Sequence, residues 1–360
     1  MCLSNFVKGV CQLNTMRGAV LVQVGQPLEI MDLIIPELSH GQVLVEMHYS
    51  GVCRSQLMEA DGLRGDDRWL PHLLGHEGVG TVVQIGPGVS RFGEGDKVVL
   101  GWLKNEGCDV QGSVFKTKDS GFLVNSGPVT TLSTKTIVSE NRLISLPSGM
   151  PDEAGVLLGC ALPTGAGMVL NYSNFRENMV TAVVGLGGVG MSALLTLAAL
   201  SRFEVVAVDV DDKRLQLAQD LGADLVINSE KQNVLEQIKC HYGSGVDVCF
   251  EAGGTIESIE LGFEILNETK GHLIFASHPK SGSKISLDPH ELIKGKKISG
   301  SWGGGSNPEK ITQKLCELYL LGKLPLGKLI EKKYSLSNIN NAFHDMKRGL
   351  TLRPLIDLKS

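Results

Sequence analysis

Three glycines in the middle of the chain have the spacing of a dinucleotide-binding turn. Gly185, Gly187 and Gly190 follow a β-branched run at 181–184 and precede an Ala/Leu-rich stretch with helical character. In this G-x-G-x-x-G arrangement, the first glycine permits a tight strand-to-helix turn, the second lets a pyrophosphate approach the backbone, and the third lets helix and strand pack closely. Gly188 lies within the same turn, where free N–H groups at a helix N-terminus favour phosphate.

Asp209 gives this turn a preference between two cofactors. It closes a second strand-like run, nineteen residues after Gly190. A carboxylate at that place can accept both ribose hydroxyls of NAD, whereas it would repel the 2′-phosphate of NADP. Strand, helix, strand and acidic residue together predict an NAD site rather than a plain glycine-rich turn.

Two cysteines and one histidine elsewhere in the chain are candidate metal ligands. Cys53 ends a strand-like run, His76 stands between Gly75 and Glu77, and Cys160 lies in a Gly-rich segment. Each alone is readily explained as a small buried side chain or an ordinary hydrogen-bonded imidazole. Beside a dinucleotide-binding unit, however, two thiolates and one imidazole form the ligand set of a tetrahedral zinc with an open fourth position.

Two different folding patterns surround these residues. From Arg17 to Gly101, short apolar runs alternate with turn residues, which predicts a compact β-barrel or sandwich. After the break at 147–152, strand-like and helical periods alternate, which predicts a doubly wound α/β domain with helices on both faces of a parallel sheet. The six predicted strands are Thr181–Gly185, Glu204–Asp209, Asp224–Asn228, Val246–Glu251, His272–Ala276 and Lys297–Ser301.

The expected domain organisation has the dinucleotide-binding domain inserted into the other. Residues after Trp302 are too few to fold alone, so we expect them to return to the first domain. The catalytic domain then comprises 16–161 and 303–360, and the dinucleotide-binding domain comprises 162–302, with the catalytic cleft between them. Residues 1–15 are expected to be an N-terminal extension, either disordered or the product of an upstream start codon.

The composition of the chain argues against some classes of partner and indicates the cellular compartment. The formal net charge is −5 and the sequence contains no basic block, which argues against nucleic acid and membrane surfaces as partners. No window approaches the roughly eighteen apolar residues of a membrane span. Eight cysteines in 360 residues are too sparse for a disulfide scaffold. These features predict a cytoplasmic protein with a small-molecule substrate.

Six motifs, spread over almost the whole chain, resemble those of one enzyme family. Together they are similar to the zinc-dependent medium-chain dehydrogenase/reductase family, the alcohol dehydrogenase-like proteins, from about Met16 to Leu358. The resemblance implies a GroES-like β-barrel catalytic domain and a Rossmann domain with a six-stranded parallel sheet. The motifs are GVCRS at 51–55, GHEGVG at 75–80, GDKV at 95–98, GCALPTG at 159–165, GLGGVG at 185–190 and LRPLIDL at 352–358.

The resemblance assigns roles around the metal. Cys53, His76 and Cys160 match the catalytic zinc ligands of the family. Glu77 matches an acidic residue that lies behind the metal and exchanges with a ligand. Ser55 matches the hydroxyl that hydrogen-bonds the substrate oxygen and accepts the alcohol proton.

The resemblance also assigns contacts to the cofactor. Arg54 and Arg353 are similar to two arginines that bind the pyrophosphate. Thr164 and Val189 match positions lining the nicotinamide. Arg214 lies where a basic residue meets the adenine ribose.

Two departures from the family pattern change what is expected. Between His76 and Cys160 the chain has one cysteine, Cys108, so the four-cysteine structural zinc lobe of many members cannot form. We therefore expect one catalytic zinc per chain, with a long surface excursion at 101–136 in place of the lobe.

The second departure concerns proton transfer. Met58 stands where many members have a histidine that passes the proton to solvent, and a thioether cannot carry a proton. The proton must then leave through Ser55 and the cofactor ribose, through water, or through another group in the cleft. Gln56 replaces an acidic residue that orients the ligand imidazole, and an amide raises imidazole basicity less.

The predicted function is hydride transfer between NAD(H) and an alcohol, with the aldehyde or ketone as the oxidised partner. The substrate is a primary or secondary alcohol, polyols and sugar derivatives included. Two alternatives stay open: a zinc-free quinone or enone reductase of the same superfamily, and a noncatalytic dinucleotide-binding protein. The resemblance further implies homodimers formed by edge strands near 298–302, or homotetramers.

Overall fold

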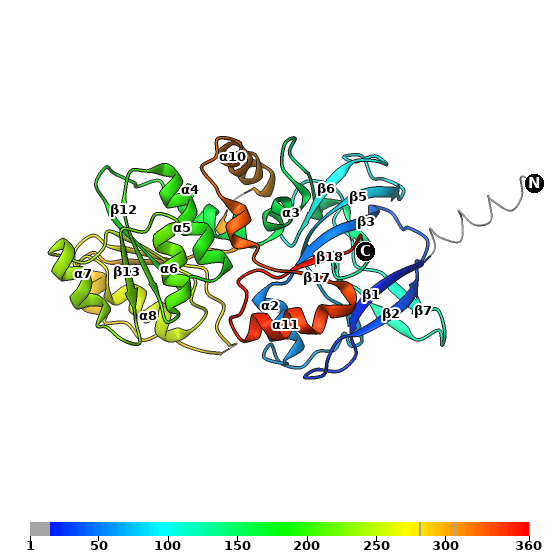
Figure 1. Cartoon of the computed structure of the whole chain (residues 1–360), viewed down its shortest axis with the longest axis horizontal. Helices are drawn as coiled ribbons and strands as arrows, with labels where there is room; N and C mark the ends of the chain where they lie inside the picture. The colour runs from blue at the N-terminus through cyan, green and yellow to red at the C-terminus, as the bar shows by residue number, and fades with distance from the viewer. Residues whose placement is uncertain (1–14, 281, 306, 360) are drawn as a thin grey trace, which may run out of the picture. The chain divides into compact units, whose positions relative to one another are not determined.

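The computed structural model describes residues 15–280, 282–305 and 307–359 (Figure 1). The expected extension at 1–15 therefore lies outside the described residues, except for Thr15. The chain forms two compact units, of which the first contains the residues up to 160 and those from 326 onward, and the second contains 161–325. No single helix among the described residues is long and apolar enough to cross a membrane.

The first unit contains a small closed barrel and a seven-stranded sheet. Alternating inward side chains from the barrel strands, such as Leu33 and Phe115, fill its core and are completely buried. The barrel strands, in spatial order, are β1 (Thr15–Leu21), β2 (Glu29–Ile34), β7 (Val114–Thr117), β8 (Leu123–Asn125) and β4 (His72–Leu73). The sheet strands are β10 (Leu143–Ser145), β6 (Lys97–Gly101), β5 (Glu77–Ile85), β3 (Gln42–Gly51), β18 (Leu355–Asp357) and β17 (Lys333–Ser335), with β9 (Lys135–Ser139) on β3.

The C-terminus completes this sheet, as the short terminal segment suggested. Strand β18 pairs antiparallel with β3, so that Leu355 lies opposite Gly51. Gly51 lies two residues before Cys53, and the last strand thus supports the segment that carries a candidate ligand. The helices of this unit are α2 (Arg54–Ala60), α3 (Asp152–Gly155) and α11 (Ile339–Lys347).

The segment 101–136 differs from the expected surface excursion. Part of it forms the β7–β8 hairpin, which closes the barrel between β2 and β4. Phe115 and Val124 point inward and are completely buried. The strands have only four and three residues, too few for an alternation of apolar and polar residues to be recognised in the sequence.

The second unit is the predicted six-stranded parallel sheet. Its order changes direction between β11 and β14, and ligands of open α/β sheets bind at the carboxyl ends of strands at such a switch point. The strands, in order, are β13 (Leu225–Asn228), β12 (Glu204–Asp209), β11 (Val180–Val184), β14 (Val248–Glu251), β15 (His272–Phe275) and β16 (Lys297–Gly300). The helices are α4 (Ala161–Leu170), α5 (Gly188–Leu200), α6 (Asp212–Asp220), α7 (Val234–Tyr242), α8 (Ile256–Glu264), α9 (Pro289–Lys294) and α10 (Pro308–Leu320).

Residues 303–325 belong to this second unit, whereas the sequence placed them in the catalytic domain. Helix α10 packs on α4. Gly304 lies so close to α4 that a Cβ on it would be 2.9 Å from the Cα of Gly167. This packing is a tertiary contact between segments more than a hundred residues apart, and local sequence patterns do not report it.

Candidate metal and cofactor sites

The three candidate metal ligands converge in the first unit. Cys53 lies between β3 and α2, His76 precedes β5, and Cys160 follows the 3₁₀ turn Val156–Gly159. Their ligand atoms all lie within 4.8 Å of one another, and the two Sγ atoms are 3.9 Å apart. Three residues distant in sequence thus present two sulfurs and one imidazole nitrogen to a common point, which is a donor set that zinc prefers.

Without a metal, the two sulfurs have very different affinities for protons. The hydrogen bond with Cys160 holds the pKa of Cys53 well below its ordinary value, against the opposing effect of burial. The same hydrogen bond, together with burial, raises the pKa of Cys160 well above its ordinary value. Burial lowers the pKa of His76, but contact with Cys53 outweighs burial and the net change is upward. A divalent cation would let both sulfurs exist as thiolates.

Glu77 and Arg353 form a buried ion pair beside these ligands. An Arg353 guanidinium nitrogen lies 2.8 Å from Oε1 of Glu77, and the two side chains are 4% and 0% exposed. Arg353 also donates to the carbonyl oxygen of Val52 at 3.3 Å. The pair links the terminal segment to the ligand segments. The contact of Arg353 with pyrophosphate stays a prediction.

The first turn of α2 places three further groups near the sulfurs. Ser55 Oγ is buried and has no hydrogen-bond partner among the described residues. Gln56 uses Oε1 to accept the backbone N–H of Cys53 at 2.9 Å, while its Nε2 has no partner there. Arg54 is exposed. Gln56 therefore positions Cys53 through the backbone, and Ser55 keeps an uncommitted hydroxyl.

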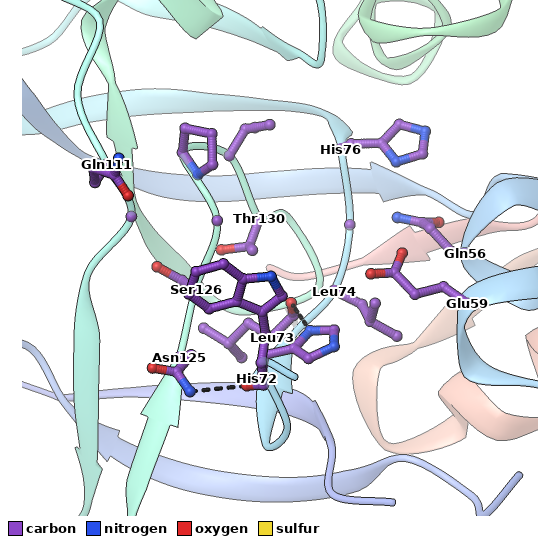
Figure 2. A pocket seen from close by; sticks show the side chains of 16 residues that line it. Gln56, Glu59, His72, Leu73, Leu74, His76, Gln111, Asn125, Ser126 and Thr130 are labelled. Carbon is purple, nitrogen blue, oxygen red and sulfur yellow. Dashed lines mark hydrogen bonds between the residues drawn. The ribbon is translucent and has the colours of Figure 1, made fainter. Parts of the chain in front are cut away.

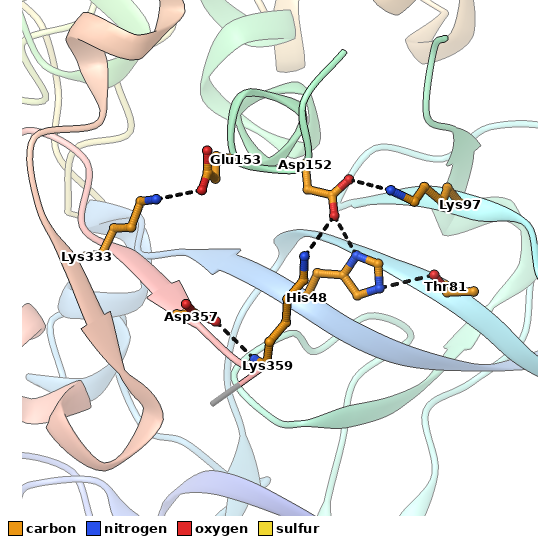
Figure 3. A network of polar contacts seen from close by, with 8 residues as sticks. All are labelled: His48, Thr81, Lys97, Asp152, Glu153, Lys333, Asp357 and Lys359. Atoms are coloured by element: carbon orange, nitrogen blue, oxygen red, sulfur yellow. Dashed lines mark hydrogen bonds and ion pairs between the residues drawn. The ribbon is translucent and has the colours of Figure 1, made fainter. Parts of the chain in front are cut away.

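Helix α3, which leads toward Cys160, is fixed by a polar network (Figure 3). Asp152 accepts from Nδ1 of His48 at 2.7 Å, from Lys97 at 3.0 Å and from Lys359 at 3.2 Å. The network joins strands β3 and β6 and the C-terminal residues to the start of α3. Burial raises the pKa of Asp152, but the lysine and histidine contacts outweigh burial and lower it to about 2.

The predicted glycine turn joins β11 to α5 in the second unit. Gly185 has a φ of 84°, which L side chains rarely adopt. A Cβ on Gly190 would lie 1.8 Å from the carbonyl oxygen of Gly185, whereas one on Gly187 would meet nothing within 4 Å. Gly187 is the N-cap of α5. The turn is therefore tightly packed at two glycines and open at the third, and the open position lies at a helix N-terminus.

Asp209 lies next to this turn at the end of β12. Its side chain accepts the Leu186 N–H at 2.5 Å and the backbone N–H groups of Val210 and Asp211 at 2.9 and 3.0 Å. The guanidinium of Arg214 lies 4.0 Å from its Oδ2. The carboxylate thus ties two strand ends of the sheet together on the side where a dinucleotide would bind.

Thr164 and Val189 lie on adjacent helices of the second unit. Helices α4 and α5 approach closely at Gly165, which has no side chain. A Cβ on Gly165 would lie 2.0 Å from the carbonyl oxygen of Val189. Thr164 is buried. Gly188 is the first residue of α5. These predicted cofactor positions therefore share one helix pair and one turn.

A cavity of about 360 Å³ in the first unit was not foreseen from the sequence (Figure 2). It lies against His76 and is bordered by α2, the β4 segment and loops of 101–136. The polar residues of its wall are Gln56, Glu59, His72, His76, Gln111, Asn125, Ser126 and Thr130. No pattern in the sequence indicated this cavity, because its wall comes from segments that lie far apart in the sequence and that the fold brings together.

Comparisons with known proteins give a consistent result. Residues 39–148 match the family model of the alcohol dehydrogenase GroES-like domain, and residues 188–319 match that of the zinc-binding dehydrogenase. An S-(hydroxymethyl)glutathione dehydrogenase of Photobacterium damsela subsp. piscicida is 30% identical over 367 residues, covering 94% of this chain and 99% of that protein. One of Synechocystis sp. is 29% identical with the same coverage.

Two solved structures resemble the chain over nearly its full length. The benzyl alcohol dehydrogenase of Acinetobacter calcoaceticus is 30% identical with a TM-score of 0.84, covering 95% of this chain and 99% of that chain. The alcohol dehydrogenase zinc-binding domain protein of Burkholderia ambifaria is also 30% identical, with a TM-score of 0.87 and coverages of 95% and 98%.

Proposed function

Because the chain belongs to the zinc-dependent medium-chain dehydrogenase/reductase family of alcohol dehydrogenase-like proteins, we propose that Cys53, His76 and Cys160 hold its catalytic zinc. The protein is a zinc-dependent, NAD-linked oxidoreductase acting on CH–OH groups. The observation that carries the ligand assignment is the convergence of two sulfurs 3.9 Å apart and one imidazole. These donors suit zinc in charge, softness and number.

Bound at these residues, zinc would supply Lewis acidity that lowers the pKa of the substrate hydroxyl toward neutrality. Ser55 is the proposed acceptor of the hydroxyl proton, because its buried Oγ has no other partner among the described residues. Met58 cannot continue the transfer. Transfer beyond Ser55 would then use the cofactor ribose, water or another group in the cleft. Glu77 is proposed as a residue behind the metal, held by Arg353.

NAD is proposed to bind along the glycine turn of the second unit. The open space above Gly187 leaves room for the pyrophosphate at the N-terminus of α5. Asp209 would accept the ribose hydroxyls, with Arg214 beside it. Thr164, Gly188 and Val189 would complete the nicotinamide end, and Arg54 and Arg353 are proposed to meet the pyrophosphate.

A single zinc per chain is also part of the proposal. Cys108, the one cysteine between His76 and Cys160, donates its S–H to the Gly88 carbonyl at 3.6 Å. It contacts Glu140 rather than another thiol. This environment supports the view that the four-cysteine zinc site of other members has no counterpart in this chain.

The substrate is proposed to be a primary alcohol of the form R–CH₂OH. The names of the relatives, S-(hydroxymethyl)glutathione dehydrogenase and benzyl alcohol dehydrogenase, share a hydroxymethyl group on a larger body. Secondary alcohols and polyols are the broader class to be compared with it. We further propose a cytoplasmic homodimer or homotetramer. Strand β16 is an edge of its sheet, and Trp302 beyond it is 68% exposed, which suits pairing between copies.

Metal analysis tests the proposal first. Protein purified without added metal and passed over a desalting column is expected to contain about one zinc per chain, and Cys160→Ser is expected to lose the zinc and turnover while still binding NADH. Full activity of Cys160→Ser would refute the ligand assignment. Wild type with near-zero zinc would favour the quinone reductase or noncatalytic alternatives. An alcohol panel with NAD then compares R–CH₂OH compounds with secondary alcohols.

A further inference from the structure

A second group of potential metal ligands lies outside the catalytic cluster. It consists of Glu59 in the last turn of α2, Asp67 in the following loop and His72 in β4. One ligand atom from each lies within 4.8 Å of the others. None of the three contributes to the function proposed above, and none stood out in the sequence.

The hydrogen bonds of His72 leave its second ring nitrogen facing a carboxylate. Nδ1 lies 2.9 Å from the carbonyl oxygen of Leu73, and since a carbonyl only accepts, Nδ1 carries a proton. Nε2 lies 2.8 Å from Oδ2 of Asp67. In neutral imidazole this nitrogen has a lone pair, so the contact needs either a second proton on the ring, which makes it a His–Asp ion pair, or a metal cation that both atoms bind from one side. Metal-binding histidines commonly donate their other N–H to a backbone carbonyl.

The two carboxylates increase the need for a positive charge. Asp67 is oriented by the Trp69 N–H, which donates to its Oδ1 at 2.9 Å and leaves Oδ2 for the cluster. The carbonyl oxygen of Glu59 accepts the Gly62 N–H at 3.0 Å, whereas its carboxylate has no hydrogen bond or ion pair to another described residue. Carboxylates this close repel each other unless a cation lies between them.

The cluster opens onto the cavity beside His76, which would admit an ion and its water ligands. Glu59 and His72 both line this cavity, and both side chains are labelled in Figure 2. His72 is 5% exposed. Gln56, which is 1% exposed, lines the same cavity, and its Nε2 has no partner among the described residues. A buried, unsatisfied donor at this wall indicates that an acceptor, such as an anion or an ion-bound water, completes the site.

We propose that Glu59, Asp67 and His72 bind a second divalent transition-metal cation, separate from the catalytic zinc. Two carboxylate oxygens with one imidazole nitrogen suit manganese, whereas the thiolates of the catalytic cluster select zinc. The ion would link α2, which follows Cys53, to β4, which precedes His76. It would therefore stabilise the two segments that carry these catalytic ligands.

Manganese is the appropriate probe because it binds carboxylates and imidazole well and thiolates poorly. Zinc-loaded, desalted protein is titrated with Mn²⁺, and the six-line electron paramagnetic resonance signal of the free ion is measured. We expect saturable binding of one Mn²⁺ per chain. Glu59→Gln, which is partly exposed and conservative in shape, should weaken the binding roughly tenfold or more, and His72→Gln should do the same.

Two control variants separate this site from other features. His48→Gln removes a histidine that also contacts an aspartate, Asp152, but without a third ligand, and Mn²⁺ binding should be unchanged. Cys160→Ser should also retain Mn²⁺ binding, even though the catalytic zinc is lost. Mn²⁺ should raise the melting temperature of wild type and not of Glu59→Gln. Absence of stoichiometric binding, or equal binding by wild type and Glu59→Gln, would overturn the proposal.

Discussion

Removal of the Arg353 guanidinium is expected to destabilise the first unit strongly. Arg353 and Glu77 lie 2.8 Å apart and are almost completely buried. Two unit charges about 4 Å apart attract each other by about 4 kcal/mol at an effective dielectric of about 20. Breaking a buried pair by losing one partner costs about 3–5 kcal/mol, because the remaining charge stays buried without compensation. We therefore expect Arg353→Met to lower the free energy of unfolding by about 3–5 kcal/mol.

Urea unfolding followed by tryptophan fluorescence measures this change. The chain has three tryptophans, and a Trp302→Phe background leaves Trp69 and Trp102, which both lie in the first unit. The unfolding signal then reports on the unit that contains the ion pair. Zinc-loaded protein is used throughout, so that metal loss does not mask the effect.

An exposed ion pair provides the matched control. Arg17 and Asp32 lie 4.0 Å apart with side chains 56% and 64% exposed, so Arg17→Met should cost no more than about 1 kcal/mol. Adding Glu77→Gln to Arg353→Met removes the uncompensated carboxylate, so the double variant should lose less stability than the sum of the singles. If Arg353→Met lost as little as the Arg17 control, the inference of a stabilising buried pair would be wrong.

Three further predictions concern the cofactor turn and acid stability. Asp209→Ala should raise the KM for NAD and narrow the preference for NAD over NADP, measured by steady-state kinetics with both cofactors. Gly190→Ala should lower the free energy of unfolding of the second unit by about 1–3 kcal/mol in urea, because the new Cβ would lie 1.8 Å from the Gly185 carbonyl oxygen. Gly187→Ala should leave the free energy of unfolding unchanged, because its Cβ would meet no atom within 4 Å, and should weaken NADH binding in a fluorescence titration. Folding lowers the pKa of Asp152 from 3.8 to about 2, so its ionised form stabilises the fold above about pH 4 and this stabilisation is lost as the pH falls toward 2. The melting temperatures of wild type and Asp152→Asn should therefore differ at pH 5 and converge near pH 2.

The second unit could be predicted from local patterns. Each of its six strands is a short β-branched or apolar run between turn residues, and all six predicted strands overlap strands of the structure. The glycine turn has a similarly local cause, since its spacing follows from the geometry of one strand-to-helix connection. Patterns of this kind can be recognised in the sequence alone, because they depend only on residues that are neighbours along the chain.

The candidate zinc ligands were also visible in the sequence, through their residue types and the motifs that contain them. The sequence did not show that these ligands lie close together. Cys53 and Cys160 are brought together by the sheet of the first unit and by the turn after α3. The same limit applies to the buried ion pair of Arg353 with Glu77, which the sequence did not indicate; the contact of Arg353 with pyrophosphate, implied by the family resemblance, stays a prediction.

The sequence by itself thus determined the α/β class of the second unit, and it predicted the metal donors and the preference of Asp209 for NAD. Only the tertiary structure decided that 101–136 closes the barrel, that 303–325 packs with α4, and that Glu59, Asp67 and His72 meet beside a cavity. The physical reason is the range of the interactions. Turn geometry and strand alternation act between near neighbours, whereas burial, ion pairing and metal ligation depend on residues that the complete fold brings together.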